Sequence, residues 1–169
     1  MTPEKFMARA IEIGRAGLRT KDARPFAAVV VKHGKIVGEG RSQQKTLLDP
    51  TAHGEIVAIR EACGRLGTAD LSGCELYTTC EPCPLCVSAI WWAKISKMYY
   101  AHTQEDCERI GFSTKALVDE VRRPRASRKL PSERICVGEA EMLFQEWAAE
   151  GMRIHGAAAQ SPSSGYPHR

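Results

Sequence analysis

Apolar and polar positions along this chain repeat with two different periods. After Thr2-Pro3-Glu4, apolar residues at Phe6, Ala10 and Ile13 recur at helical spacing and predict a first helix. The helical pattern returns in three later segments, 54–66, 83–93 and 139–155. Shorter runs rich in β-branched and aromatic residues predict five strands, at 26–31, 36–37, 74–79, 97–101 and 134–137. Residues 38–52 have no clear period and are predicted as a loop.

The order of these elements predicts the fold class. Helices lie between most of the strands, which favours parallel pairing with helices on both faces of a sheet. The turn at His33-Gly34-Lys35 joins the first two strands as an antiparallel hairpin, so the sheet is mixed. We therefore expect an α/β protein, a three-layer α/β/α sandwich around a mixed five-stranded sheet, within residues 1–155. Residues 156–169, rich in Ala, Ser, Pro and Gly, are predicted to form a flexible C-terminal tail.

Length and composition narrow the class of protein. The 169 residues suit one domain, and 43% hydrophobic with 26% charged residues is an ordinary globular mixture. No run of 18 apolar residues is present, and the first residues lack the apolar segment of a secretory signal, so we expect a cytoplasmic protein without membrane contact. A net charge of +4 is too small to indicate a nucleic-acid partner.

Seven cysteines direct attention to metal chemistry. An odd number in a cytoplasmic chain favours free thiols over a disulfide framework. Four of them are scattered and are interpreted as small buried apolar residues. The other three, Cys80, Cys83 and Cys86, lie within seven residues.

Two short motifs at loop-to-helix junctions carry candidate chemistry. Cys83 and Cys86 share one helical face near a helix N-terminus, where thiolates are favoured. With His53 they supply three zinc ligands and leave a fourth position for water, as in a catalytic site. Glu55 is placed to exchange protons with that water. Cys80 and Cys83 have the same spacing, but Pro82 directly precedes Cys83, so Cys80 is interpreted as a non-ligand neighbour.

Two plainer interpretations compete with this one. A structural zinc site or a thiol redox site would also use a C-x-x-C motif. A redox site leaves His53 and Glu55 without a role, and its C-x-x-C should follow an early strand. A non-catalytic binding protein on the same fold should lack the glutamate or a ligand, whereas all four residues are present here.

The combination of H-x-E with P-C-x-x-C is the signature of zinc-dependent deaminases. From about residue 6 to 155 the chain resembles the cytidine deaminase-like superfamily, and within it the bacterial guanine deaminases. The segments that carry the resemblance are Arg24-Pro-Phe26, Asp49-Pro-Thr-Ala-His53, Leu76 to Cys86, Ala89-Ile-Trp-Trp92, Gly111-Phe112 and Pro124. The tRNA adenosine deaminases share the zinc segments but match the later positions less well.

This resemblance implies a site and a partner. It implies one Zn²⁺ per chain on His53, Cys83 and Cys86, with Glu55 as the proton shuttle. It also implies a homodimer in which C-terminal segments close the active sites. The substrate-binding candidates are Phe26, Ser42, Gly54, Trp92, Phe112 and Thr114.

Two positions depart from the pattern of the guanine deaminases. Family members usually carry Asn where this chain has Ser42, and Asp just after Gly-Phe where it has Ser113-Thr114. The expected reaction is deamination of guanine to xanthine plus ammonia, a step of purine metabolism. The alternatives are a cytosine-like base, guanosine or an aminated triazine, or adenosine in tRNA, for which the basic run 122–129 is the motivating feature.

Overall fold

The computed structural model describes residues 2–155, so the predicted tail at 156–169 lies outside the described residues. The described chain falls into two compact units, Met1–Arg123 and Pro124 onward. The first unit holds all four strands and six of the seven α-helices. In chain order it contains α1 (Pro3–Gly17), β1 (Ala27–Lys32), β2 (Lys35–Arg41), α2 (Gln44–Leu47), α3 (Gly54–Leu66), β3 (Cys74–Cys80), α4 (Pro84–Trp92), β4 (Lys97–His102), α5 (Gln104–Arg109) and α6 (Lys115–Arg122).

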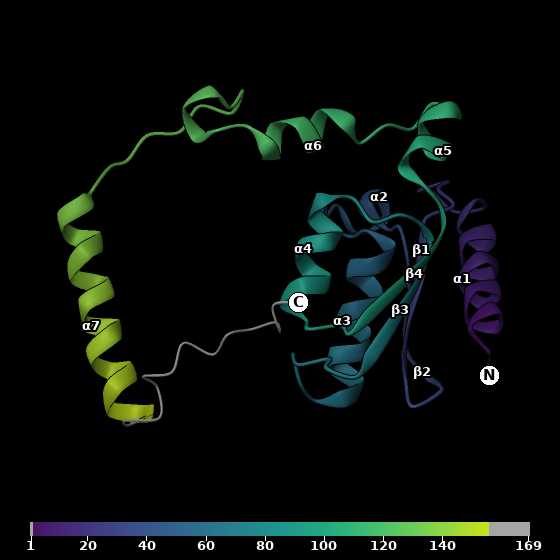
Figure 1. The fold of residues 1–169 in the computed structure, drawn as a ribbon, viewed down its shortest axis with the longest axis horizontal. Coiled ribbons are helices and arrows are strands. Elements are labelled where there is room, and N and C mark those ends of the chain that lie inside the picture. The colour runs from purple at the N-terminus through teal and green to yellow at the C-terminus, as the bar shows by residue number, and fades with distance from the viewer. Residues whose placement is uncertain (1, 156–169) are drawn as a thin grey trace. The chain divides into compact units, whose positions relative to one another are not determined.

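The strands form one mixed sheet in the order β2-β1-β3-β4 (Figure 1). Strand β1 is antiparallel to both β2 and β3, whereas β3 and β4 are parallel. The predicted hairpin and the parallel pair across a helix are therefore confirmed. Strands β2, β3 and β4 end at the same edge of the sheet, where β1 begins, and loops at such an edge commonly form sites.

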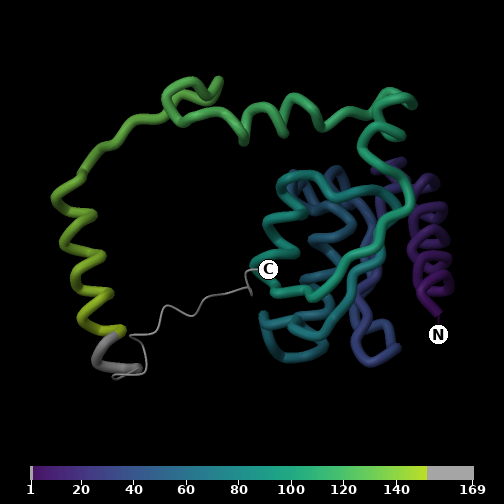
Figure 2. The backbone as a smooth tube through the Cα atoms, in the orientation of Figure 1, coloured from purple at the N-terminus to yellow at the C-terminus, as the bar shows by residue number. Residues whose placement is uncertain are grey.

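Helices cover both faces of this sheet. The side chains of β1 alternate, so that Val29 packs with Phe6 of α1 on one face and Val30 packs with α3 on the other. Helices α3 and α4 share that second face, where Ile59 and Ile90 join the larger apolar cluster. The path of the backbone in Figure 2 shows α1 on one side of the strands and α3 on the other.

Helix α3 lies unusually close to β2 because two glycines face it. A Cβ atom at Gly40 would lie 2.2 Å from the carbonyl oxygen of Gly54, and one at Gly38 would lie 2.2 Å from that of Ala58. Both distances are far below van der Waals contact, so only glycine permits this approach. The first turn of α3, which carries Glu55, is thereby fixed against the sheet.

The predicted fifth strand at 134–137 is wrong, and the sheet has four strands. Cys136 has a φ of 50°, which an extended strand excludes, and α7 (Val137–His155) begins at the next residue. A 3-10 helix, Arg125–Ser127, precedes it in the second unit. The predicted loop at 38–52 contains the end of β2 and the short α2.

Helices α5 and α6 were not anticipated from the apolar pattern. Helix α5 has the sequence QEDCER, which offers no apolar stripe, and starts at a capping box between Thr103 and Asp106. None of the helices among residues 2–155 is long and apolar enough to cross a membrane.

Candidate metal and active site

His53 and Cys83 occupy equivalent places at the starts of two neighbouring helices. His53 is the N-cap of α3 and Cys83 is the N-cap of α4, and both have extended backbone dihedrals. Pro84 at the first position of α4 has no N–H to leave unpaired there. Cys86 lies one turn further along α4 and is fully buried. The two helix starts converge at the edge of the sheet where β2 and β3 end.

Three candidate ligand atoms surround one position. The Sγ atoms of Cys83 and Cys86 are 3.8 Å apart, and Nδ1 of His53 lies 3.7 Å from the first and 3.5 Å from the second. Tetrahedral zinc with ordinary bond lengths requires about 3.8 Å between two sulfurs and about 3.6 Å between sulfur and nitrogen. The residues therefore fit zinc in type and in spacing. Among residues 2–155 they form the one cluster of three or more such groups arranged to hold a metal ion.

The protonation of the ligands is coupled. Hydrogen bonding with Cys86 and with the imidazole of His53 lowers the pKa of Cys83 to about 4 despite its burial. The same contact, together with burial, raises the pKa of Cys86. The hydrogen bond to Cys83 raises the pKa of His53. Because metal binding requires both thiolates and a neutral ligand nitrogen, loading the site releases protons.

Glu55 lies beside the ligands without joining them. It occupies the first turn of α3, and its side chain is 6% exposed. Burial raises the pKa of this carboxyl group above its ordinary value. The hydroxyl of Thr78 donates to Oε1 at 3.4 Å, a long hydrogen bond that leaves the carboxylate free to exchange protons. A buried carboxylate with a raised pKa is suited to general acid–base work near neutral pH.

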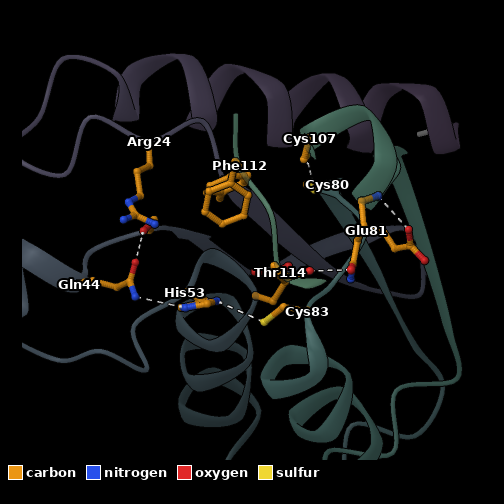
Figure 3. Close-up of a pocket in the computed structure, with 13 residues that line it drawn as sticks. Arg24, Gln44, His53, Cys80, Glu81, Cys83, Cys107, Phe112 and Thr114 are labelled. Carbon is orange, nitrogen blue, oxygen red and sulfur yellow. Dashed lines mark hydrogen bonds between the residues drawn. The ribbon is translucent and has the colours of Figure 1, made fainter. Parts of the chain in front are cut away.

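A cavity of about 470 Å³, part of it open to solvent, adjoins this site (Figure 3). The rings of Phe26 and Phe112 are 4.6 Å apart at an angle of 47° and form an aromatic wall. The thirteen lining residues are Arg24, Phe26, Ser42, Gln44, His53, Glu55, Cys80, Glu81, Cys83, Gln104, Cys107, Phe112 and Thr114.

Two of the predicted pocket residues do not line this cavity. Trp92 is 83% exposed at the end of α4, and Gly54 faces the sheet instead. A Cβ atom at Gly54 would lie 2.8 Å from Cα of Ala27, so the missing side chain serves packing against β1 and adds no room beside the metal ligands. The other predicted pocket residues, Phe26, Ser42, Phe112 and Thr114, do line it.

Arg24, Gln44 and Gln104 also line the cavity, although they were not among the predicted substrate-binding residues. Arg24 directly precedes the Pro-Phe motif, and Gln44 follows Ser42 by two residues. Gln104 starts α5 and accepts a hydrogen bond of 2.6 Å from the hydroxyl of Thr114. Arg24 and Gln44 lie within two residues of predicted pocket residues, and this was the available signal. Gln104 lies near none of them, and only tertiary packing brings it to the cavity.

Cys80 contacts Cys107 and is not part of the cluster of His53, Cys83 and Cys86. Its Sγ lies 2.8 Å from Sγ of Cys107 on α5, and both thiols are free and buried. Burial and this neighbour raise the pKa of Cys80. The choice between two overlapping C-x-x-C pairs is thus resolved, because Cys80 faces α5 and the sulfurs of Cys83 and Cys86 face His53.

Comparisons with known proteins agree with this geometry. Residues 1–102 match the cytidine and deoxycytidylate deaminase zinc-binding region. Guanine deaminase of Bacillus subtilis is 40% identical over 147 residues, covering 87% of this chain and 94% of the relative. Its crystal structure superposes with a TM-score of 0.84 at 39% identity, covering 88% of this chain and 95% of that one.

More distant relatives share mainly the first part of the chain. A guanine deaminase structure from Nitrosomonas europaea has a TM-score of 0.63 at 34% identity and covers 66% of this chain and 65% of its own. A tRNA-specific adenosine deaminase of Aquifex aeolicus is 46% identical over 77 residues, 46% of this chain and 51% of the relative. The sequence match, the fold and the three-ligand site together establish that the chain belongs to the cytidine and deoxycytidylate deaminase family of zinc-dependent aminohydrolases, as a homologue of guanine deaminase.

Proposed function

We propose that the protein deaminates guanine, converting guanine and water to xanthine and ammonia. The observation that carries this proposal is the position of Glu55, buried beside a three-ligand zinc site and on the wall of an aromatic cavity. The 40% identity with a guanine deaminase over nearly the whole of that relative supports guanine as the base.

In this proposal, one residue transfers protons and others position the substrate. Bound zinc would lower the pKa of water enough to supply a nucleophile at neutral pH. Glu55 takes the proton of the attacking water on a carboxylate oxygen and delivers it to the departing amine. Its burial favours the protonated form that this second transfer requires.

The aromatic wall holds the substrate ring. Phe26 and Phe112 offer apolar surface on which a planar base can pack, and they exclude water from the cavity. Thr114 and Gln104 are bonded to one another at the far wall, and both are neutral. Ser113-Thr114 stands where guanine deaminases carry an aspartate after Gly-Phe.

We propose that the protein acts as a homodimer. Helix α7 exposes Met142, Leu143, Phe144 and Trp147, and the small unit that carries it is too short to bury them itself. In the first unit, Trp92 and Tyr100 are exposed apolar residues. A second copy of this chain is the partner that offers apolar surface to both sets.

Solution mass tests the homodimer. Light scattering should give about twice the 18.6 kDa of one chain, and Phe144→Glu should shift the mass toward the monomer. Glu146→Gln, on the same helix, is the matched control and should leave the mass unchanged. A monomeric wild-type protein would contradict the dimer.

We also place the enzyme in the cytoplasm, where free thiols such as those of the described cysteines persist.

Deamination of adenosine in tRNA is the second candidate. The observation that favours it is the run 122–129, which has five basic residues in eight, together with the tRNA-specific relatives. Binding of tRNA that weakens steeply with salt would support this candidate. Its absence at low salt would exclude it.

An ammonia-release screen tests the main proposal. The zinc-loaded full chain would be offered guanine, cytosine, adenine, guanosine, an aminated triazine and tRNA, with zinc content measured on the same sample. We expect ammonia and xanthine from guanine, with about one zinc per chain. His53→Ala should lose both zinc and turnover. Ammonia release confined to another substrate would overturn the assignment of guanine.

A further inference from the structure

Arg24 is a cation without a protein counter-charge at the edge of the cavity. Its side chain lines the cavity and is partly buried. It forms no ion pair with a carboxylate among residues 2–155, whereas Arg9, Arg60 and Arg65 there do. Its guanidinium carbon lies 5.9 Å from the ring centroid of Phe112. In Figure 3, Arg24 and Gln44 lie on one side of the cavity, and Glu81 lies on the other.

The backbone around Arg24 is fixed by close contacts. Glycines of α1 let it approach, since a Cβ atom at Gly17 would lie 2.8 Å from the carbonyl oxygen of Arg24. The next carbonyl, of Pro25, accepts a hydrogen bond of 3.0 Å from the hydroxyl of Thr79. The carbonyl of Phe26 accepts one of 2.8 Å from the backbone N–H of Ser42. The backbone at Arg24 is therefore held in place, which lowers the entropic cost of orienting its side chain toward a ligand.

The chemistry of the guanidinium determines what it can bind. Arginine only donates hydrogen bonds, in a planar fork, and it stays charged at all physiological pH values. In the same cavity, the side-chain amide of Gln104 already accepts from Thr114 and donates to the carbonyl of Pro82. The fork of Arg24 is a donor that remains for a ligand. A planar ring with two adjacent acceptors satisfies both arms of the fork at once.

A purine with a 6-oxo group has this pair of acceptors. Its O6 and N7 atoms lie side by side and form the bidentate contact that arginine makes with guanine in nucleic acids. That edge lies away from C2, the carbon that bears the amino group. A base with C2 toward His53 and Glu55 can therefore present O6 and N7 to another side of the cavity.

We propose that Arg24 is a specificity-determining residue that binds the O6 and N7 edge of a 6-oxopurine. This inference rests on the proposed function, since it takes the cavity as the base site. It assigns the selection of the 6-oxo group to a residue next to the Pro-Phe motif. Arg24 touches the ring edge and takes no part in proton transfer.

The test compares ligands that differ in O6. Hypoxanthine has O6 and N7, whereas purine lacks O6, and neither carries the 2-amino group that reacts. We expect Arg24→Ala in the zinc-loaded full chain to weaken hypoxanthine binding about tenfold and to change purine binding less than about twofold, as measured by calorimetry. Arg24→Lys should fall between Arg24→Ala and the wild type, because an ammonium group cannot form the fork. Arg19→Ala, the same change at an exposed position of the same loop, should change neither affinity.

Several results would overturn the inference. Equal losses for hypoxanthine and purine would mean that Arg24 supports the cavity only, and no loss would mean that it makes no contact. An effect of Arg24→Ala on inorganic phosphate binding with an unchanged base preference would make it an anion site. Circular dichroism of each variant shows whether it folds, and Arg24→Gln serves as a second neutral variant.

Turnover separates this inference from the proposed function. The ratio of kcat/KM for guanine over 2-aminopurine, which lacks O6, should fall about tenfold in Arg24→Ala. Guanine turnover with an unchanged ratio overturns the role of Arg24 and leaves the guanine deaminase function intact. Wild-type protein that binds hypoxanthine through Arg24 but releases no ammonia from guanine overturns the function and leaves the inference intact.

Discussion

The Nε2 atom of His53 lies 3.2 Å from the side-chain amide nitrogen of Gln44. The other ring nitrogen, Nδ1, faces the two sulfurs. When Nδ1 gives its lone pair to a metal, Nε2 carries the proton and becomes a donor. The amide of Gln44 then has to present its oxygen, and a rotation about the last side-chain bond that does so gives up the hydrogen bond of 2.9 Å from its nitrogen to the carbonyl of Pro50. The hydroxyl of Ser42, which donates to this amide at 3.4 Å, can equally accept from it after the rotation. Gln44 is therefore a positioning residue for the imidazole.

Replacing Gln44 should weaken zinc binding without removing a ligand. We expect Gln44→Ala to lower zinc affinity about tenfold, because residues that orient a metal-bound histidine usually contribute this much. Competition with a chromophoric chelator measures the change. Gln44→Glu, whose carboxylate accepts from Nε2–H, should retain wild-type affinity, and Gln43→Ala is the neighbouring control. Unchanged affinity in Gln44→Ala would show that the imidazole is oriented by its ring packing alone.

Glu55 should be needed for turnover and dispensable for zinc. Glu55→Gln removes the proton acceptor but keeps the size of the side chain, so we expect kcat to fall about a thousandfold while the zinc content stays at one per chain. Ammonia release and elemental analysis of the same sample measure both quantities. Glu81→Gln is the control, because Glu81 also lines the cavity but accepts a hydrogen bond from the backbone of Gln104. A Glu55→Gln variant with near wild-type turnover would refute the proton-transfer role.

The close contact between β2 and α3 should make Gly40 intolerant of a side chain. A Cβ atom there would lie 2.4 Å from the backbone nitrogen of Ala58 as well as against Gly54. We expect Gly40→Ala to reduce the free energy of unfolding by about 2 kcal/mol and to lower kcat, because it pushes the helix start that carries Glu55. Chemical denaturation measures the first effect.

Gly64, on α3, provides a control for Gly40 of β2. No atom lies within 4 Å of a Cβ built at this exposed helical position. Gly64→Ala should stabilise the protein by about 0.5–1 kcal/mol through helix propensity. Equal effects of the two substitutions would contradict the packing argument.

The bidentate pair between Arg9 and Glu39 should give a pH-dependent stability. Two hydrogen bonds of 2.8 Å join α1 to β2 and hold the pKa of Glu39 below its ordinary value. A lowered pKa in the folded state means that the stabilisation is complete above the unfolded value of 4.5 and is lost as the pH falls through the folded value.

The measurement is a pair of denaturation series at pH 7 and near pH 3. Arg9→Ala should cost about 0.5–1 kcal/mol at pH 7, the upper range for a partly exposed pair, and much less at the acidic end. Arg15→Ala, an exposed position of the same helix, should cost less at both. A cost of Arg9→Ala that does not change with pH would show that its alkyl packing is what matters.

The catalytic half of the site could be predicted from the sequence because its members are local. His53 and Glu55 are two residues apart, Cys83 and Cys86 are three apart, and each pair lies at the start of a helix. The three-residue spacing of the cysteines places both on one helix face before any tertiary contact exists. The residue types, two thiols, one imidazole and one carboxylate, restrict the chemistry further.

The substrate half depended on contacts that no local pattern encodes. Arg24 and Phe112 are far apart in the sequence, and only the packing of the loop after α1 and of the loop after α5 brings them to one cavity. Trp92 belongs to the same motif region as the ligands, yet its side chain is exposed and does not line the cavity.

The chain itself therefore determined the cluster of His53, Cys83 and Cys86, the hairpin, and helices α1, α3, α4 and α7. Tertiary structure decided that Cys80 pairs with Cys107, that Gly54 serves contact with β1, and that a positive φ at Cys136 ends the expected fifth strand. The physical reason for this division is the distance along the chain over which each kind of interaction acts. Helix and strand periods act over a few residues, whereas a cavity wall is assembled by the burial of apolar faces from distant segments.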